Sequence, residues 1–363
     1  MKNTFISLLI TLAVMLCSDV VFGEDKFYKF DNAKKVDGIV YDKKTNTPIS
    51  GIVKSYYASG NIEVEIPFNE GKIDGISKEY YENGKLREET SYTNNKSAGV
   101  RKIYYENGKL KEEIPYTNGK VEGVRKTYYE NGKLKEETPY TNEKIEGVSK
   151  KYYKNGKLKE EIPYTNDKIE GVSKKYYESG KLEEKLPYTN NKLEGIAKTY
   201  YESGKLEREI PFNYDKVEGL TKRYYESGKL KEELQFSNNI KEGIAKTYYE
   251  NGKLESEIPL SNDKKEGLGK GYYESGILQE ETPYTNEKIE GVSKKYYESG
   301  KLYVEIPYTN NKREGIGKKY YESGKLYVEI IYKNDKVVSG YIYEKNGNKI
   351  ELTIEQLHKI NKE

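Results

Sequence analysis

Glycine recurs every 24 residues along most of the chain, and this spacing restricts the fold more than any other feature. One series of 12 glycines runs from Gly51 to Gly315, and a second series of 12 runs from Gly60 to Gly324. A period between 20 and 50 residues is typical of repeat proteins, in which each unit stacks only on its neighbours. The sequence therefore predicts 12 tandem units of 24 residues without an insertion.

Each unit carries the signals of a β-hairpin. The unit Gly99–Glu122 reads GVRKIYYENGKLKEEIPYTNGKVE. Asn107-Gly108 favours a two-residue type I′ turn, and Asn118-Gly119 predicts a second turn. The pairs that these turns would place opposite each other are Tyr105 with Leu110, Lys102 with Glu113, and Tyr116 with Val121. Proline at the place of Pro115 in 9 of 12 units argues for a short second strand. We therefore expect strands near 100–106 and 109–114, with PYTNGK as a connector.

The alternation of side chains along these strands predicts two different faces. The face expected to be buried carries Tyr105, Leu110, Ile114, Tyr116, Val121 and the bare Gly123. The opposite face carries Val100, Lys102, Tyr104, Glu113, Pro115 and Glu122. Lys recurs at the position of Lys102 in every unit, and the residue facing it is Glu except at Lys185. This ladder of opposite charges is expected to fix the strand register.

The two ends of the chain depart from the repeat. Residues 1–23 combine Lys2, an apolar run from Phe5 to Leu16 and a cleavage site at Gly23, which indicates a signal peptide and export to the periplasm, outer surface or medium. Lipidation at Cys17 is less favoured, because Leu16 stands where a lipobox needs a small residue. We expect an N-terminal cap at 24–50, the repeat array at 51–338 and a C-terminal cap at 339–363. Thr353 and Gln356 form a capping-box pattern that predicts a short helix to about Asn361.

The charge balance and the scarcity of reactive residues exclude several function classes. The chain has 63 basic and 60 acidic residues with their signs interleaved, so nothing indicates a nucleic-acid partner. Membrane association stays open, but the charge pattern does not indicate it. A single His (His358), a single Cys (Cys17) and equivalent carboxylates in every unit argue against catalysis, a metal site or a cofactor. We therefore expect that the protein is not an enzyme.

The motif G-x-x-K-x-Y-Y-E-N-G-K-L-x-x-E, seen as Gly99 to Glu113, resembles the MORN repeat variant, a tandem hairpin module also found in YwqK-type antitoxin-like bacterial proteins. The resemblance covers residues 51–338. It implies an all-β fold: an elongated, single-layer antiparallel sheet of about 12 hairpins that serves as a binding or scaffolding surface. The length of this array and its near-identical units depart from the antitoxin-like members.

The leading functional hypothesis is an exported, non-enzymatic scaffold that binds a protein or a glycan at the cell envelope or on a host surface. The alternative is an antitoxin-like or immunity protein that masks a toxin partner. Exceptions to the repeat gather in its C-terminal third, where Tyr303-Val304 and Tyr327-Val328 replace charged pairs. Two explanations stay open: packing of Val304 and Val328 against the terminal helix, or an exposed aromatic patch. The candidate binding residues are Tyr272, Tyr296, Tyr303, Tyr320 and Tyr327.

Overall fold

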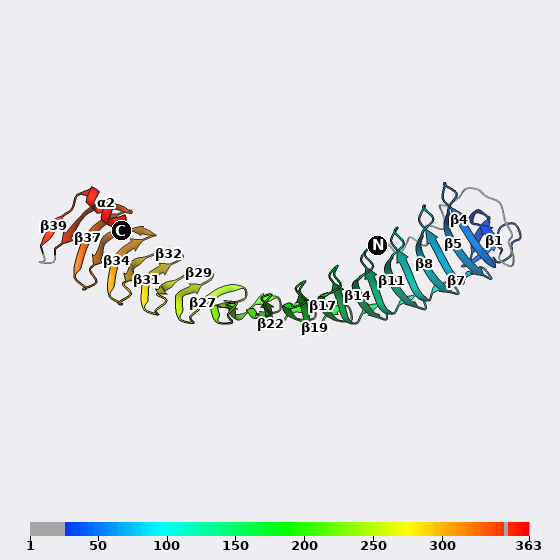
Figure 1. Ribbon diagram of the computed structural model, residues 1–363, viewed down its shortest axis with the longest axis horizontal. Coiled ribbons are helices and arrows are strands. Elements are labelled where there is room, and N and C mark those ends of the chain that lie inside the picture. Colours follow the sequence, from blue (N-terminus) through cyan, green and yellow to red (C-terminus); the bar gives the residue numbers. More distant parts are fainter. Residues whose placement is uncertain (1–25, 345–347, 363) are drawn as a thin grey trace. The chain divides into compact units, whose positions relative to one another are not determined.

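The computed structural model describes residues 26–344 and 348–362. The expected signal peptide, residues 1–23, lies outside this part. The chain divides into two compact units, residues 1–180 and 181–363, and each is described by itself. Within each unit, the hairpins follow one another in chain order and form one open layer of strands (Figure 1). The prediction of an all-β antiparallel sheet of 12 hairpin repeats with a C-terminal helix is confirmed.

Most repeats contribute a strand of six residues, a strand of eight and a short strand of two, whereas β27 (Ile240–Tyr248) joins the short strand of one repeat to the first strand of the next. The repeat strands of the first unit are β4 (Gly51–Tyr56), β5 (Ile62–Asn69), β6 (Lys72–Ile73), β7 (Gly75–Tyr80), β8 (Leu86–Thr93), β9 (Lys96–Ser97), β10 (Gly99–Tyr104), β11 (Leu110–Thr117), β12 (Lys120–Val121), β13 (Gly123–Tyr128), β14 (Leu134–Thr141), β15 (Lys144–Ile145), β16 (Gly147–Tyr152), β17 (Leu158–Thr165), β18 (Lys168–Ile169) and β19 (Gly171–Tyr176).

The second unit continues the same pattern and ends in two irregular strands and a helix. Its elements are β20 (Leu182–Thr189), β21 (Lys192–Leu193), β22 (Gly195–Tyr200), β23 (Leu206–Asn213), β24 (Lys216–Val217), β25 (Gly219–Tyr224), β26 (Leu230–Ser237), β27 (Ile240–Tyr248), β28 (Leu254–Ser261), β29 (Lys264–Lys265), β30 (Gly267–Tyr272), β31 (Leu278–Thr285), β32 (Lys288–Ile289), β33 (Gly291–Tyr296), β34 (Leu302–Thr309), β35 (Lys312–Arg313), β36 (Gly315–Tyr320), β37 (Leu326–Lys333), β38 (Lys336–Tyr343), β39 (Lys349–Glu351) and α2 (Ile354–Lys362). Among the helices of the described residues, none combines the length and the apolar character needed to cross a bilayer.

The register confirms part of the predicted pairing and corrects the rest. Lys102 lies opposite Glu113, as expected, but Leu110 lies opposite Tyr104 and not Tyr105. The loop is longer than predicted: the Tyr105 N–H donates to the Lys109 carbonyl at 2.8 Å. Only Gly108 of the Asn-Gly pair has positive φ, so the turn is type I followed by a left-handed glycine and not type I′. Leu110 therefore shares the face of Tyr104.

The type I′ turn occurs at the second loop. Asn118 and Gly119 both have positive φ, 52° and 83°, and Tyr116 lies opposite Val121 as predicted. Most other repeats place a non-glycine residue at the second position. The backbone strain of this non-glycine residue is offset by a hydrogen bond from its side chain to the preceding repeat. The Asp167 carboxylate, for example, accepts the Ile145 N–H at 2.7 Å.

Pro115 lies inside a strand, so the expectation of a short second strand and a six-residue connector was wrong. β11 extends through Pro115 to Thr117. The Pro115 carbonyl accepts the Glu122 N–H at 3.1 Å. The nitrogen and the carbonyl oxygen of a strand residue point to the same side of the strand. The Pro115 nitrogen therefore points to the place where the chain leaves β12, and the missing N–H of proline costs no strand hydrogen bond there. Gly123 makes this exit with φ +108°, and a Cβ at this position would lie 3.3 Å from the Pro115 ring.

An irregular segment covers the first strand of the array. β1 (Phe27–Lys29) pairs in parallel with β4. It is followed by the 3-10 turn η2 (Phe30–Asn32) and by the hairpin of β2 (Ala33–Val36) with β3 (Ile39–Asp42). The carbonyl of the buried Ile49 accepts the Gly71 N–H at 2.7 Å, the same bond that most repeats make to the next. The segment therefore occupies the edge that a preceding repeat would fill.

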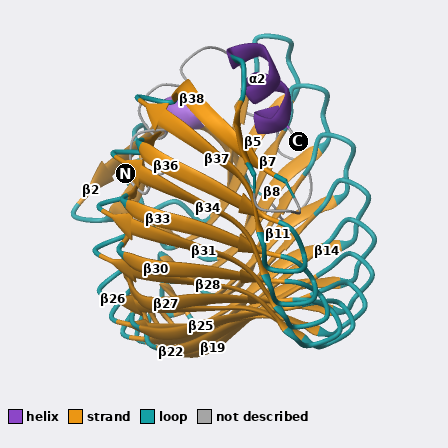
Figure 2. Ribbon diagram, turned by 90° about the vertical axis from the view of Figure 1, so that its left-hand side faces the viewer, coloured by secondary structure: helices purple, strands orange, loops and turns teal. Residues whose placement is uncertain are grey.

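Helix α2 covers the last strands of the array beside β38 (Figure 2). The predicted capping box is confirmed, since Thr353 N–H donates to Gln356 Oε1 at 2.9 Å and Gln356 N–H donates to Thr353 Oγ1 at 3.3 Å. Leu357 is fully buried on Val328, Ile330 and Tyr332. This contact shows that packing against the helix accounts for Val328. Elsewhere the described repeats have few buried side chains.

Candidate functional site

Both tyrosines of the repeated Tyr-Tyr pair hold neighbouring repeats together. In most repeats the first tyrosine donates its hydroxyl to a carboxylate of the preceding repeat, as from Tyr104 to Glu89 at 2.9 Å. The second donates to a backbone carbonyl of the following repeat, as from Tyr105 to the Tyr128 oxygen at 2.7 Å. We call the first set the outer tyrosines and the second set the inner tyrosines. Most repeats are thus bonded in both directions along the array.

Most outer tyrosines share one electrostatic environment. Burial, and then the hydrogen bond to Glu89, raises the pKa of Tyr104 to about 12. The same causes act on Tyr296 with Glu281, where the pKa is also about 12. The carboxylate acceptors therefore keep these hydroxyls protonated well above the ordinary tyrosine pKa.

The five predicted binding tyrosines fall into two groups. Tyr272, Tyr296 and Tyr320 are outer tyrosines, and their hydroxyls donate to Glu257, Glu281 and Glu305 at 3.0, 2.7 and 2.8 Å. The rings of Tyr303 and Tyr327 instead contact the inner tyrosines Tyr297 and Tyr321, with centroid distances of 4.9 and 4.8 Å. The two therefore do not extend the outer row into one patch, because they project from the bulged position beside the inner tyrosines.

One repeat breaks the charge ladder. Lys185 lies opposite Lys198 instead of presenting a carboxylate, and like charges placed opposite each other destabilise a sheet. The outer tyrosine that follows Lys185 is Tyr200. Lys185 stands at the position where the equivalent outer tyrosines find a Glu. Lys198 pairs instead with Glu209 at 2.9 Å within its own hairpin.

Replacing Lys185 by Glu should therefore stabilise the array. The change restores the carboxylate that the other repeats carry and removes the repulsion from Lys198, for an expected gain of about 0.5–1.5 kcal/mol in the free energy of unfolding. Denaturant melts would measure it. The reverse substitution at an intact step, Glu161→Lys, is the matched control and should lower stability. A destabilised Lys185→Glu variant would contradict this reading of the ladder.

The two faces of the sheet differ in how much the repeats vary. One face, which we call the ladder face, keeps an aliphatic residue, Lys and Tyr at the positions of Val100, Lys102 and Tyr104 in all 12 repeats. The other, which we call the variable face, differs between most neighbouring repeats at the positions of Arg101, Ile103 and Glu112. At the position of Arg101 the residues in order are Val53, Ser77, Arg101, Arg125, Ser149, Ser173, Ala197, Thr221, Ala245, Gly269, Ser293 and Gly317.

The aliphatic row on the ladder face is exposed to solvent. Its members Val100, Val148 and Ile196 are 41%, 44% and 54% exposed. The variable face is the half-buried one, with Ala197 and Ser149 only 4% and 6% exposed. The face predicted to be buried is therefore the less exposed of the two. In the middle repeats, however, no second layer of structure packs on it.

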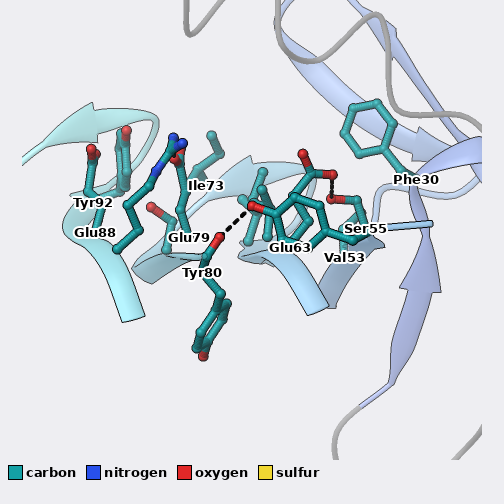
Figure 3. Close-up of a pocket in the computed structure, with 14 residues that line it drawn as sticks. Phe30, Val53, Ser55, Glu63, Ile73, Glu79, Tyr80, Glu88 and Tyr92 are labelled. Carbon is teal, nitrogen blue, oxygen red and sulfur yellow. Dashed lines mark hydrogen bonds and ion pairs between the residues drawn. The ribbon is translucent and has the colours of Figure 1, made fainter. Parts of the chain in front are cut away.

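A cavity of about 180 Å³ opens on the variable face where the first two repeats meet the N-terminal segment. Apolar side chains line part of its wall and acidic groups stand around it, as Figure 3 shows for Phe30, Val53, Glu63, Glu79 and Tyr92. The remaining lining residues are Ser55, Tyr57, Val64, Ile66, Ile73, Ser77, Tyr80, Arg87 and Glu88.

The three carboxylates of this cavity have different partners. Glu79 is paired with Arg87, and Glu88 is paired with Arg101 at 2.6 Å. Glu63 accepts one hydrogen bond, from the Ser55 hydroxyl at 3.2 Å (Figure 3), and no basic side chain of the described residues forms an ion pair with it. The cavity therefore presents one carboxylate without a counter-charge beside apolar and aromatic walls.

The sequence carries one signal for this cavity, which lies outside the predicted binding residues. Glu63-Val64 replaces the Lys-Glu pair of the representative unit, just as Tyr303-Val304 does near the other end. Within the described residues, no group of three or more His, Cys, Asp or Glu side chains is arranged to hold a metal ion. His358 is exposed on α2.

Comparison with known families matches the chain to the MORN repeat variant in 12 segments. These are residues 49–70, 73–94, 98–118, 121–142, 145–166, 169–190, 193–214, 217–238, 241–262, 265–286, 289–310 and 313–334. The protein belongs to the MORN repeat variant family. The repeats of this family generally carry no enzymatic activity.

Comparison with curated proteins found no match. Among solved structures, the crystal structure of TcdB2-TccC3 without its hypervariable C-terminal region aligns with 13% identity and a TM-score of 0.17, over 85% of this chain. TcdB2-TccC3-Cdc42 aligns with 11% identity and a TM-score of 0.14, over 84% of this chain. This chain spans 18% and 22% of those chains. At these scores, the alignments carry no argument about fold or function.

Proposed function

We propose that the protein is an exported, non-enzymatic scaffold that binds a protein or a glycan partner at the cell envelope or on a host surface. The observation that carries this proposal is the contrast between the two faces. The ladder face repeats the same contacts in nearly every unit, whereas the variable face differs in charge, size or polarity between most neighbouring repeats. Repeat proteins commonly use such extended surfaces for binding.

The chemistry of the carboxylates supports a binding role over catalysis. Acid-base catalysis needs a group that its surroundings make different from its neighbours. The ladder carboxylates instead stand in closely similar settings, each accepting an outer tyrosine hydroxyl, as Glu113 does from Tyr128 at 2.6 Å. Export is proposed from the signal-peptide pattern of residues 1–23.

The C-terminal tyrosines of the variable face belong to the proposed surface. Tyr303 stands at a position where other repeats carry Lys, as at Lys111 and Lys135, so its ring is an addition to the repeat pattern. Tyr327 occupies the equivalent place in the next repeat but also packs against the cluster under α2. Tyr303 is therefore the better probe of binding. The outer tyrosines Tyr272, Tyr296 and Tyr320 can contribute only ring surface, since their hydroxyls are already bonded.

A capture experiment tests the proposal. Residues 24–363, immobilised, should retain a saturable partner from host-cell extract or from the envelope fraction of the producing cell. Capture of a toxin from the producer would favour the antitoxin-like alternative. Absence of any saturable partner in both extracts would count against a binding scaffold.

The exported protein should begin at Glu24, and mass spectrometry of the exported chain would show this.

A further inference from the structure

The cavity at the first repeat differs from four other repeats in what lies over its inner tyrosine. In four other repeats, a lysine ammonium from the bulged position sits over the ring of the inner tyrosine. The pairs are Lys111 with Tyr105 at 5.7 Å, Lys135 with Tyr129 at 6.0 Å, Lys159 with Tyr153 at 5.7 Å, and Lys231 with Tyr225 at 5.1 Å from the ring centroid. The chain thus shows that this ring position accepts a cation.

In the first repeat the equivalent lysine is replaced by a carboxylate. Glu63 stands at the bulged position beside Tyr57, and the one basic side chain among the residues that line the cavity, Arg87, is paired with Glu79. The orientation of Tyr57 is fixed all the same, because its hydroxyl donates to the Tyr80 carbonyl at 2.6 Å. An aromatic face and a carboxylate without a counter-charge therefore face the same space.

The floor of this space is apolar here and polar in the next repeats. Val53 is 2% exposed at a position where the third and fourth repeats carry Arg101 and Arg125. Val64 replaces the carboxylate found at Glu88 and Glu112. Phe30, from the N-terminal segment, adds a further ring to the wall. The volume, about 180 Å³, is that of a small ring or a short alkyl chain, since a cavity of roughly 150 Å³ accommodates benzene.

We propose that this cavity binds an alkyl- or arylammonium group, with the apolar body on Val53, Val64 and Phe30 and the ammonium between Glu63 and the Tyr57 ring. The ligand carries the cation that the first repeat lacks. The same chemistry is present in a free amine and in a lysine side chain of a partner protein, so the experiment separates these two sources.

Titration of the full mature chain with 2-phenylethylamine, followed by NMR or calorimetry, tests the site. Saturable binding of the amine is expected, at least about tenfold tighter than binding of the uncharged 2-phenylethanol, since the alcohol can form neither the ion pair with Glu63 nor the cation-π contact with Tyr57. A capped Gly-Lys-Gly peptide is the second probe. Binding of the peptide would identify a partner side chain as the source, and binding of the amine alone would identify a free amine.

Two variants decide whether Glu63 acts as proposed. Glu63→Lys copies the arrangement of Lys111 on Tyr105, so the chain tolerates it, and its own ammonium should abolish amine binding. Glu255→Lys makes the same change beside Tyr249, outside the cavity, and should leave binding unchanged. Equal binding of amine and alcohol, unaltered binding to Glu63→Lys, or no binding of either probe would overturn the proposal. Because these titrations use small probes, their failure would leave the capture experiment on the whole array unaffected.

Discussion

Replacing Leu357 by alanine is expected to loosen the C-terminal repeats, at a cost of about 2–5 kcal/mol in their local free energy of unfolding. Leu357 is fully buried, and Val328, Ile330 and Tyr332 beneath it are only 0%, 2% and 3% exposed. The helix reaches the sheet because Gly340 has no side chain: a Cβ there would lie 2.6 Å from the Leu357 side chain. Truncating Leu357 removes the largest contact of this small core.

Hydrogen exchange with mass spectrometry would measure this effect. Amides of β37 and β38 should exchange at least about tenfold faster in the Leu357→Ala variant, while peptides from β4 to β11 keep their rates, since repeats transmit stability mainly to neighbours. Ile354→Ala on the same helix is the control, because Ile354 is 48% exposed. Unchanged exchange in β37 and β38, or equal loosening at both ends of the chain, would show that α2 is not a cap.

Raising the pH from 9 to about 12 is expected to destabilise the whole array. The folded-state pKa of Tyr104, Tyr176, Tyr224 and Tyr320 lies at about 12, above the ordinary value of 10.0. The folded protein therefore holds these protons more tightly than the unfolded chain. Their contribution to stability is complete below pH 10 and is lost as the pH rises toward 12. With several such groups, we expect the melting temperature to fall by roughly 10 °C or more.

Lysines also titrate in this range, so a matched variant is needed. Phenylalanine at Tyr104, Tyr176 and Tyr224 removes three of the titrating hydroxyls and keeps the rings. This variant should melt lower than the parent at pH 8, and its melting temperature should fall less between pH 9 and 12. Parallel curves for the two proteins would mean that the outer tyrosine hydroxyls do not set the alkaline limit.

The main features of the fold could be predicted because the residues that define it recur in every unit. Lys102 facing Glu113 and the turn at Asn118-Gly119 follow from side-chain alternation and turn chemistry alone. The first loop was assigned wrongly because Asn-Gly suits both a type I′ turn and a type I turn with a left-handed glycine. A one-residue bulge at Lys111 absorbs the difference, and such a bulge leaves no distinct mark in the sequence.

The candidate site was less accessible to sequence reasoning. Exceptions such as Tyr303 and Lys185 are visible as departures from the repeat. The contacts of these residues cannot be predicted in the same way, because the bulge moves Tyr303 away from the row of outer tyrosines in which regular strand alternation would place it. The cavity at Glu63 brings together the N-terminal segment and the first two repeats, and their convergence depends on the parallel pairing of β1, which no local pattern predicts.

The most direct test of the proposed scaffold compares two triple variants in the capture experiment. The first changes the variable face to residues that the chain itself uses at those positions: Lys151→Thr, Lys175→Thr and Tyr303→Lys. The second changes the exposed row of the ladder face in the same three repeats: Val148→Ser, Val172→Ser and Val292→Ser. If the variable face recognises the partner, the first variant should lose at least about tenfold in affinity, more than 1.4 kcal/mol, while the second binds like the parent. Loss of binding only in the ladder-face variant would contradict the account.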